Sequence, residues 1–333
     1  MIASRSDTTI ESIARVRLAT LPTPLHRAAR LEQALGAGPL YVKRDDLTGF
    51  AVAGNKARPL EFLLGAALTQ DCDVLVAAGS PSSNFCAAAA VAARVAGLDC
   101  ELLFPGPPPT APSVNVELAR AAGARLWFDA VPTREGLDDA VLRHADVLRD
   151  AGRRPYPLPR GGATAVGALG YAHAAAELDE QCRAAGFTPR TVVVPTGSGG
   201  TQAGIVAGQA AFGLPWRVVG ASVSRPASSV KDRILVLAKD CAAMIGPDQP
   251  TEADVDVRDC RGAGFGVAGA ADRATAAMAL RTEGLLLDDY YGAKAMTLLR
   301  NLLAGGASTP AVYWHTGGIP AALAALREWG TPA

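Results

Sequence analysis

The sequence places a lysine directly after a Gly-Asn pair, in the stretch GNKARPL at 54–60. An amine can lose its proton near neutral pH and condense with an aldehyde, whereas a guanidinium cannot. Lysine is scarce in this chain, because arginine supplies nearly all of the other positive charge. There are five lysines: Lys43, Lys56, Lys231, Lys239 and Lys294. We interpret Lys56 as a candidate for covalent chemistry, with a solvated first-turn lysine as the alternative.

A glycine-rich loop follows the apolar run TVVV at 191–194 and reads PTGSGGTQAG at 195–204. Glycines let backbone N–H groups converge on an anion, and the N-terminus of the helix that follows adds partial positive charge. The loop lacks the Gly-Lys-Ser/Thr of a Walker motif, and position 202 is Gln where a dinucleotide fingerprint needs glycine. We therefore predict a site for a single phosphate, with a plain tight turn as the alternative.

A lysine that captures an aldehyde and a cradle for one phosphate together describe the cofactor pyridoxal 5′-phosphate (PLP). The stretch HTGG at 315–318 comes at the end of the last predicted strand, where its hydroxyl could face the pyridine nitrogen. Opposite a hydroxyl, the ring nitrogen is less firmly protonated than it would be opposite a carboxylate. The carbanion at Cα is then less delocalised, which favours elimination over transamination.

Short β-branched runs alternate with longer Ala-, Leu- and Arg-rich segments, which is typical of a parallel α/β architecture. The predicted strands are 39–44, 73–78, 101–104, 125–128, 191–194, 217–223 and 311–315. The predicted helices are 58–68, 84–96, 113–122, 136–151, 167–184, one after the glycine loop, 266–285 and 292–304. The early strand has no apparent partner nearby and is expected to pair with the later strands, so that the middle of the chain is an insertion.

The composition is that of a globular protein large enough for two domains: 333 residues, 49% hydrophobic and 19% charged, with a net charge of +0. The neutral balance gives no support to a nucleic-acid or membrane partner. No segment approaches the roughly 20 apolar residues that span a bilayer. The N-terminal segment, MIASRSDTTIESIARVR, has no apolar signal-peptide core. Six scattered cysteines without a CxxC pair predict free thiols in a cytoplasmic protein and no metal site.

Six segments, in order and at consistent spacing, resemble the PLP-dependent family of 1-aminocyclopropane-1-carboxylate (ACC) deaminase and D-cysteine desulfhydrase. They are KRDDLTGFAVAGNKARPLEFLL (43–64), SSNF (82–85), PTGSGGTQAG (195–204), GFGV (264–267), RTEGLLLDDYYGAKAM (281–296) and HTGG (315–318). The resemblance covers nearly the whole chain from about Pro22 onward.

The resemblance implies an α/β fold of the fold type II, tryptophan-synthase-β-like kind. Such a fold has two lobes with parallel-rich sheets flanked by helices, and the smaller lobe is inserted in the larger. We expect a large PLP-binding domain at 1–55 and 161–333 and a small inserted domain at 56–160. Family members are commonly homodimers, so a homodimer is expected here.

The resemblance also implies which residues contact the cofactor. Lys56 would hold PLP covalently, Asn84 would bond its phenolic oxygen, and Thr316 would face its pyridine nitrogen. The phosphate would be held by Gly197, Ser198, Gly199, Gly200 and Thr201. A simple N-cap role is the alternative for Asn84.

On the substrate side, Ser83 would lie by the carboxylate and Tyr291 would be the active-site tyrosine, a candidate proton donor or acceptor beside Lys56. Tyr290 is the alternative inward-facing tyrosine. Asp45 and Asp46 are interpreted as loop and cap residues.

The predicted substrate shell is Ser82, Ser83, Phe85, Phe265 and Gly292, and it departs from the family pattern at each of these positions except Ser83. In the family, Gln commonly precedes the Ser-Asn pair and His or Gln follows it. Tyrosine is usual at position 265, and Glu or Thr follows the active-site tyrosine. Losing polar groups that bond a substrate should change the substrate. The missing Glu argues against ACC ring opening, and the pattern suggests a roomier, more apolar pocket.

These features predict a PLP-dependent lyase or deaminase, D-cysteine desulfhydrase-like, acting on a small or non-standard amino acid. Removal of the Cα proton and β-elimination would give an α-keto acid and ammonia. The alternatives are a racemase or β-replacement enzyme, and a PLP-binding protein without turnover.

Overall fold

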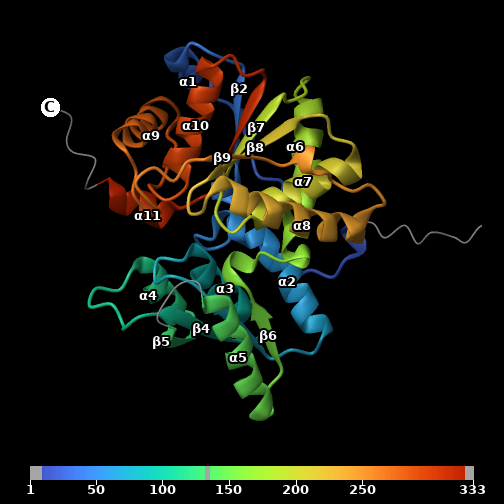
Figure 1. Ribbon diagram of the computed structural model, residues 1–333, viewed down its shortest axis with the longest axis vertical. Helices are drawn as coiled ribbons and strands as arrows, with labels where there is room; N and C mark the ends of the chain where they lie inside the picture. Colours follow the sequence, from blue (N-terminus) through green and yellow to red (C-terminus); the bar gives the residue numbers. More distant parts are fainter. Residues whose placement is uncertain (1–9, 132–135, 327–333) are drawn as a thin grey trace, which may run out of the picture.

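The computed structural model describes residues 10–131 and 136–326, so that part of the polar N-terminal segment lies outside the described residues. Two sheets organise these residues into an upper and a lower lobe (Figure 1). The six-stranded sheet has the order β1-β2-β10-β7-β8-β9. Its strands are β1 (Leu25–Arg27), β2 (Leu40–Arg44), β7 (Thr191–Thr196), β8 (Arg217–Ser222), β9 (Asp256–Asp259) and β10 (Ala311–His315).

The large sheet is parallel except for β1, and helices cover both of its faces. Alternate residues of a strand point to opposite faces. Val193 of β7 accordingly packs with α1 (Ala29–Leu35), α9 (Ala270–Glu283) and α10 (Gly292–Ala304). Its neighbours Val192 and Val194 pack with α6 (Ala165–Ala184) and α7 (Gly200–Phe212) on the other face. Both faces of this sheet are therefore buried.

The small sheet has the order β5-β4-β3-β6 and is parallel throughout. Its strands are β3 (Val74–Ala78), β4 (Asp99–Pro105), β5 (Arg125–Val131) and β6 (Pro155–Leu158). One face packs against α3 (Asn84–Val95) and α4 (Val114–Ala121), and the other against α5 (Leu137–Asp150). All four strands fall between residues 74 and 158, whereas the large sheet takes its strands from before 45 and after 190. The domain boundaries at 55/56 and 160/161 remain a prediction.

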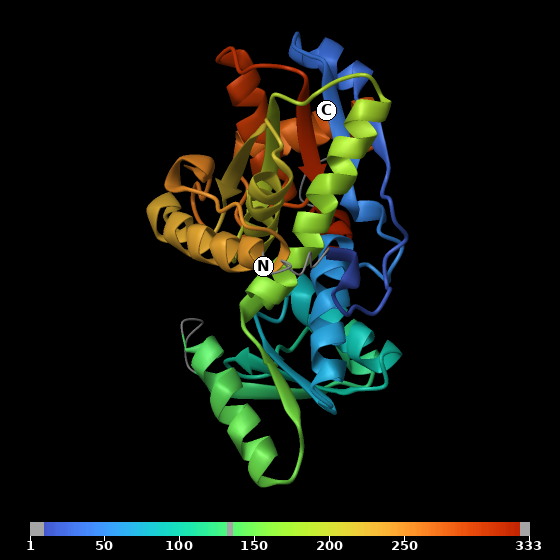
Figure 2. The same ribbon diagram turned by 90° about the vertical axis from the view of Figure 1, so that its right-hand side faces the viewer.

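Helix α2 (Ala57–Thr69) connects the two lobes, and Figure 2 shows it running from one to the other. Leu60, Leu63 and Leu64 pack into the core of the small sheet, while Phe62 packs with α6, α7 and α8 (Ala227–Ile245). Lys56 immediately precedes this helix, so the packing of α2 fixes the lysine at the junction of the lobes.

A buried cluster of charges anchors the first turn of α2. The Arg58 guanidinium bonds both carboxylate oxygens of Asp45, at 2.8 and 2.9 Å, and both of Glu177. Lys43 pairs with Glu177, and the Tyr171 hydroxyl donates to Asp45 at 2.6 Å. Burial alone would raise the pKa of Asp45, but Arg58 outweighs it and holds that pKa well below its ordinary value. The interpretation of Asp45 as a loop or cap residue is therefore wrong.

The strand at 39–44 pairs with β10 as expected, but the expectation that it lacks a nearby partner is wrong, because β1 pairs with it in antiparallel fashion. The sequence prediction also missed α8, although Val230, Ile234, Ala238 and Cys241 recur at helical spacing and are all buried. The sequence prediction also missed strand β6, which lies at the edge of its sheet and contains Pro155 and Pro157. Prolines argue against a strand because a sheet tolerates them only at its edge.

The helix expected at 266–285 is shorter, since α9 begins at Ala270. Gly266 has a φ of +81°, in the left-handed region, and cannot continue into a right-handed helix. Asp272 accepts the Gly269 N–H at 2.9 Å and so satisfies a donor at the start of α9. The short helix α11 (Ile319–Ala325), which follows HTGG, was not predicted. Within the described residues, no helix has the length and apolar character to cross a membrane.

Candidate active site

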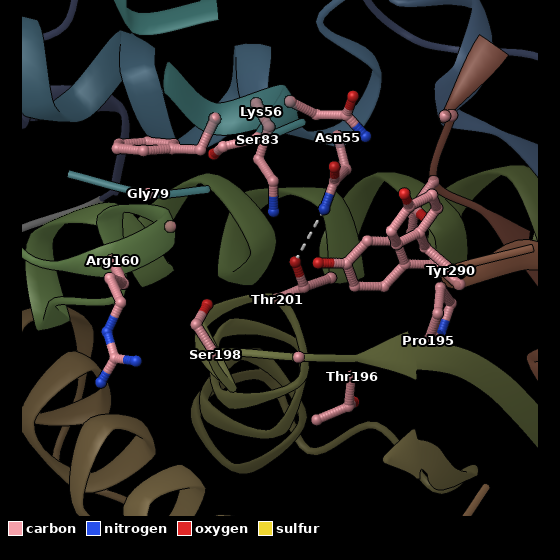
Figure 3. Close-up of a pocket in the computed structure, with 18 of the residues that line it drawn as sticks. Asn55, Lys56, Gly79, Ser83, Arg160, Pro195, Thr196, Ser198, Thr201 and Tyr290 are labelled. Atoms are coloured by element: carbon pink, nitrogen blue, oxygen red, sulfur yellow. Dashed lines mark hydrogen bonds between the residues drawn. The ribbon is translucent and has the colours of Figure 1, made fainter. Parts of the chain in front are cut away.

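A cavity between the lobes brings together residues that are far apart in the sequence (Figure 3). Of the predicted site residues, those that line it are Lys56, Ser82, Ser83, Asn84, Phe85, Gly197, Ser198, Gly199, Thr201, Phe265, Tyr291 and Thr316. Gly200 and Gly292 do not line it. Residues of the wall that the sequence analysis did not assign to the site include Asn55, Ser80, Arg160, Asp288 and Tyr290.

Lys56 ends a short 3₁₀ turn, Gly54–Lys56, that lies against the loop after β10. The Asn55 N–H donates to the Thr316 carbonyl at 2.8 Å. Gly54 has a φ of +54°, and a Cβ there would lie 2.5 Å from the same carbonyl oxygen, so only glycine fits. This close approach of two backbones holds the lysine and the HTGG loop at one site.

The Lys56 amine points into the cavity (Figure 3) and makes no hydrogen bond or ion pair with any described residue. Burial disfavours the charged ammonium and lowers the pKa of Lys56 to about 8. An appreciable fraction of the amine is therefore neutral near physiological pH, which is the form that attacks an aldehyde.

The glycine loop joins the carboxyl end of β7 to the N-terminus of α7 and faces the same space. Gly199 has a φ of +97°, and a Cβ on Gly197 would meet the Tyr291 ring at 3.0 Å. The Asn55 side-chain amide donates to the Thr201 hydroxyl oxygen at 3.0 Å, as Figure 3 shows. Gly200 instead packs against Ala163. A Cβ built on Gly200 would lie 3.2 Å from the Ala163 Cα.

The start of α3 forms another wall. Ser83 is the N-cap of α3, and its Oγ accepts the Cys86 N–H at 3.2 Å. The Asn84 Oδ1 accepts a hydrogen bond from Asn115 at 2.9 Å. The alternative reading of Asn84 as the N-cap is thus wrong, and its side-chain NH₂ group remains available to a ligand. Sequence reasoning missed Asn115, which carries no motif and acts by orienting Asn84.

Both members of the tyrosine pair line the cavity, together with Phe265. The Phe265 ring lies edge-on to Tyr290 and Tyr291, with centroid separations of 5.2 and 5.6 Å. The Tyr290 ring packs against Gly266, whereas Tyr291 packs against Gly197 of the glycine loop. The expectation that only one of the two faces inward is wrong.

Gly292 lies behind the wall and not in it. Its N–H donates to Asp288 Oδ1 at 2.8 Å, and its carbonyl accepts from the Tyr313 hydroxyl at 2.9 Å. A Cβ at this position would lie 3.1 Å from Asp288 Oδ1.

Polar residues also line the wall. Arg160 lines the cavity, with its Nε and Nη2 each 3.1 Å from Asp138 Oδ2. The side chains of Ser80, Ser82 and Ser198 also line the cavity. The expectation of a roomier, more apolar pocket than in the family stays a prediction.

These residues fit PLP. The cavity contains a partly buried amine without a partner among the described residues, a loop with close-packed glycines before a helix N-terminus, and a threonine hydroxyl on the opposite loop. The amine, the glycine loop and the threonine hydroxyl suit, in that order, the aldehyde, the phosphate and the ring nitrogen of PLP.

The comparisons with known proteins agree with this chemistry. A family model described as "Pyridoxal-phosphate dependent enzyme" matches residues 16–317. A putative ACC deaminase of Pyrococcus abyssi is 34% identical, covering 94% of this chain and 94% of the relative. A D-cysteine desulfhydrase of Klebsiella pneumoniae is 34% identical, covering 93% and 95% respectively.

Two solved structures share the fold. An ACC deaminase homologue superimposes with a TM-score of 0.87 at 30% identity, covering 96% of each chain. A threonine deaminase of T.th. superimposes with a TM-score of 0.63 at 21% identity, covering 89% of this chain and 92% of that one. The fold is therefore that of the fold type II PLP enzymes, as predicted.

The chain belongs to the family of pyridoxal-phosphate dependent enzymes, and its cofactor is PLP. Within that family it is an enzyme of the ACC deaminase and D-cysteine desulfhydrase type.

Proposed function

We propose that this enzyme is a lyase or deaminase that removes the Cα proton of a small or non-standard amino acid and eliminates a β-substituent. With one water consumed, the products are an α-keto acid, ammonia and the eliminated β-substituent in protonated form. The observation that carries this proposal is the partly buried Lys56 amine, without a partner among the described residues, in one cavity with the glycine loop.

We assign the cofactor contacts by position in the cavity. The loop from Gly197 to Thr201 holds the phosphate through its backbone N–H groups and hydroxyls. Asn84 donates its side-chain NH₂ group to the phenolic oxygen, since Asn115 already occupies its Oδ1. The Thr316 hydroxyl serves the ring nitrogen, and Lys56 forms the covalent link.

The remaining polar groups act on the amino acid. When bound, PLP supplies the electron sink that makes the Cα–H bond acidic. The Lys56 amine, once displaced from the cofactor, takes the Cα proton, because its pKa of about 8 suits a general base near neutral pH. The Ser83 Oγ accepts from the Cys86 N–H and directs its own O–H at the substrate carboxylate. Tyr291 gives or takes the second proton.

Product analysis tests the proposal and separates it from racemisation, β-replacement and cofactor binding without turnover. The purified enzyme is mixed with a panel of D- and L-amino acids, and the cofactor absorbance and keto-acid release are followed together. Keto acid with equimolar ammonia supports β-elimination. An inverted amino acid, a β-substituted product, or a spectral change without product would each identify the corresponding alternative.

Substrate choice provides a sharper prediction. No side chain projects at Gly292 and no hydroxyl is present at Phe265, so the groups that the resemblance associates with ACC and D-cysteine are absent. We expect ACC turnover at background level and D-cysteine turnover well below that of the true substrate. An ACC deaminase assayed in parallel provides the positive control. Robust ACC deamination by the unmodified protein would show that these two positions do not set specificity.

We further propose a cytoplasmic homodimer. All six cysteines are free thiols, as expected in a reducing compartment. Light scattering of the purified enzyme measures the oligomeric state.

A further inference from the structure

Asp288 is a carboxyl group within the cavity wall, just before the tyrosine pair, and is only 1% exposed. It lies against the HTGG loop. Gly318 of that loop has a φ of +87°, and a Cβ built on it would lie 2.8 Å from the Asp288 Cγ. Thr316, in the same loop, also lines the cavity. The carboxyl and the threonine hydroxyl therefore belong to the same end of the site.

The two oxygens of this carboxyl differ in their surroundings. Oδ1 accepts the Gly292 N–H at 2.8 Å, which closes the turn before α10. Oδ2 is buried and has no hydrogen-bond partner among the described residues. Leaving a buried oxygen without a hydrogen bond costs free energy, which points to a ligand group that forms a hydrogen bond with it.

Burial makes the Asp288 carboxyl hold its proton up to near neutral pH. Burial raises the pKa of Asp288 to about 7, although backbone N–H groups of the 290–292 turn pull it downward. The Tyr313 phenol of β10 interacts with it electrostatically, and burial raises the pKa of that phenol well above its ordinary value. No lysine or arginine forms an ion pair with Asp288 in the part of the chain that the structure describes.

We propose that Asp288 Oδ2, together with the Thr316 hydroxyl, binds the ring nitrogen of the cofactor and shares a proton with it. This inference rests on the proposed function of the cavity. In the transfer, the Oδ2–H bond breaks and an N–H bond forms, so a neutral pair becomes a carboxylate–pyridinium ion pair without any further reactant. The ring nitrogen then faces an acid as well as the hydroxyl expected from the sequence, so the proposed elimination depends on the leaving group of the substrate and not on a weakly protonated ring.

The test pairs a variant with a ligand that lacks the nitrogen. The probes are 4′-deoxypyridoxine 5′-phosphate, which cannot react with Lys56, and its 1-deaza analogue. The apoprotein and its Asp288→Asn variant are titrated with both. Asn still accepts the Gly292 N–H but cannot share a proton, and thermal unfolding of each apoprotein checks that the turn survives.

We expect Asp288→Asn to weaken binding of the nitrogen ligand by about tenfold, the scale of a charge-assisted hydrogen bond, and to leave the deaza ligand unchanged. Equal losses for both ligands, or no loss for either, would overturn the inference and leave the proposed function standing. If neither ligand binds the wild-type apoprotein, the proposed function fails as well.

Thr316→Val provides a readout that does not depend on the folding of the Asp288 variant. We expect this variant to keep part of the preference for the nitrogen ligand, because Asp288 remains. Complete loss of that preference would assign the whole contact to Thr316 and overturn the role of Asp288.

Discussion

At the scale of single residues, the site depends on an amine that the fold keeps partly buried. Lys56 lacks a partner among the described residues, whereas Lys43 is buried in an ion pair with Glu177 and Lys231 pairs at the surface with Glu252. An unpaired buried amine loses its proton more readily than a paired one. Position and environment together distinguish Lys56 from the other lysines.

We expect Lys56→Ala to abolish the covalent link to PLP, because no other described lysine lines the cavity. Borohydride reduction of the loaded enzyme followed by peptide mapping locates the adduct. The matched control is Lys231→Ala, which removes a surface amine and should leave the adduct in place. An adduct on another lysine in the wild-type enzyme would refute the assignment.

Tyr291 is the tyrosine that we expect to move a proton, since its ring lies against Gly197 of the glycine loop. Tyr291→Phe keeps the ring and removes only the hydroxyl. A positioned acid or base contributes about 10²- to 10⁴-fold, so kcat should fall by that factor while cofactor binding persists. Steady-state kinetics and the cofactor spectrum measure the two effects.

Tyr290→Phe is the control and should change kcat little. Both tyrosines line the cavity, so the comparison is informative. A large loss in Tyr290→Phe with none in Tyr291→Phe would exchange their roles. No loss in either would leave both proton transfers to Lys56.

At the scale of elements, the placement of Lys56 depends on the first turn of α2. Arg58 is two residues from the lysine and is almost completely buried among Asp45 and Glu177. Lys43 and Arg58 balance Asp45 and Glu177 in formal charge. Removing one member of such a cluster leaves a buried charge without compensation.

We expect Arg58→Met to lower the free energy of unfolding of the apoprotein by about 3–5 kcal/mol, because Asp45 and Glu177 lose a shared partner. Urea unfolding followed by circular dichroism measures it. Arg183→Met is the control, since its pair with Asp179 is exposed and is worth about 0.5 kcal/mol or less. Equal effects of the two substitutions would show that the buried cluster has no special role in stability.

At the scale of the whole molecule, the cavity takes its walls from both lobes. The start of α3 belongs to the elements of the small sheet, and the glycine loop and HTGG loop to those of the large one. A ligand that contacts all three must be bound by the assembled fold and not by either lobe alone.

PLP should therefore stabilise the whole fold. A ligand at 100 times its dissociation constant adds about 2.7 kcal/mol to the free energy of unfolding. We expect the thermal midpoint of the apoprotein to rise with PLP concentration in a single cooperative transition. Two transitions, with only one shifted by PLP, would instead show that one lobe binds the cofactor independently.

The sequence by itself determined the chemistry and most of the parallel α/β framework. The lysine after Gly-Asn, the glycine loop and the threonine of HTGG are local signals, because each can be recognised from the residues next to it in the sequence. The strands of both sheets that carry strong β-branched patterns were predicted for the same reason. The edge strand β6 was missed because it contains two prolines and pairs with the distant β3, and β1 was missed because its three residues are too few to show a strand pattern.

The tertiary structure alone decided which side chains face the cavity. Gly292 was expected in the substrate shell, but its turn is fixed by Asp288 and Tyr313, which come from outside its own helix. Arg160 and Asn115 lie in no motif, and Asp288 lies in the 281–296 segment without a predicted role, yet the packing of the two lobes brings Arg160 and Asp288 into the wall and Asn115 behind it. Side-chain direction follows from packing between segments far apart in the chain, and spacing along a single sequence does not contain that information.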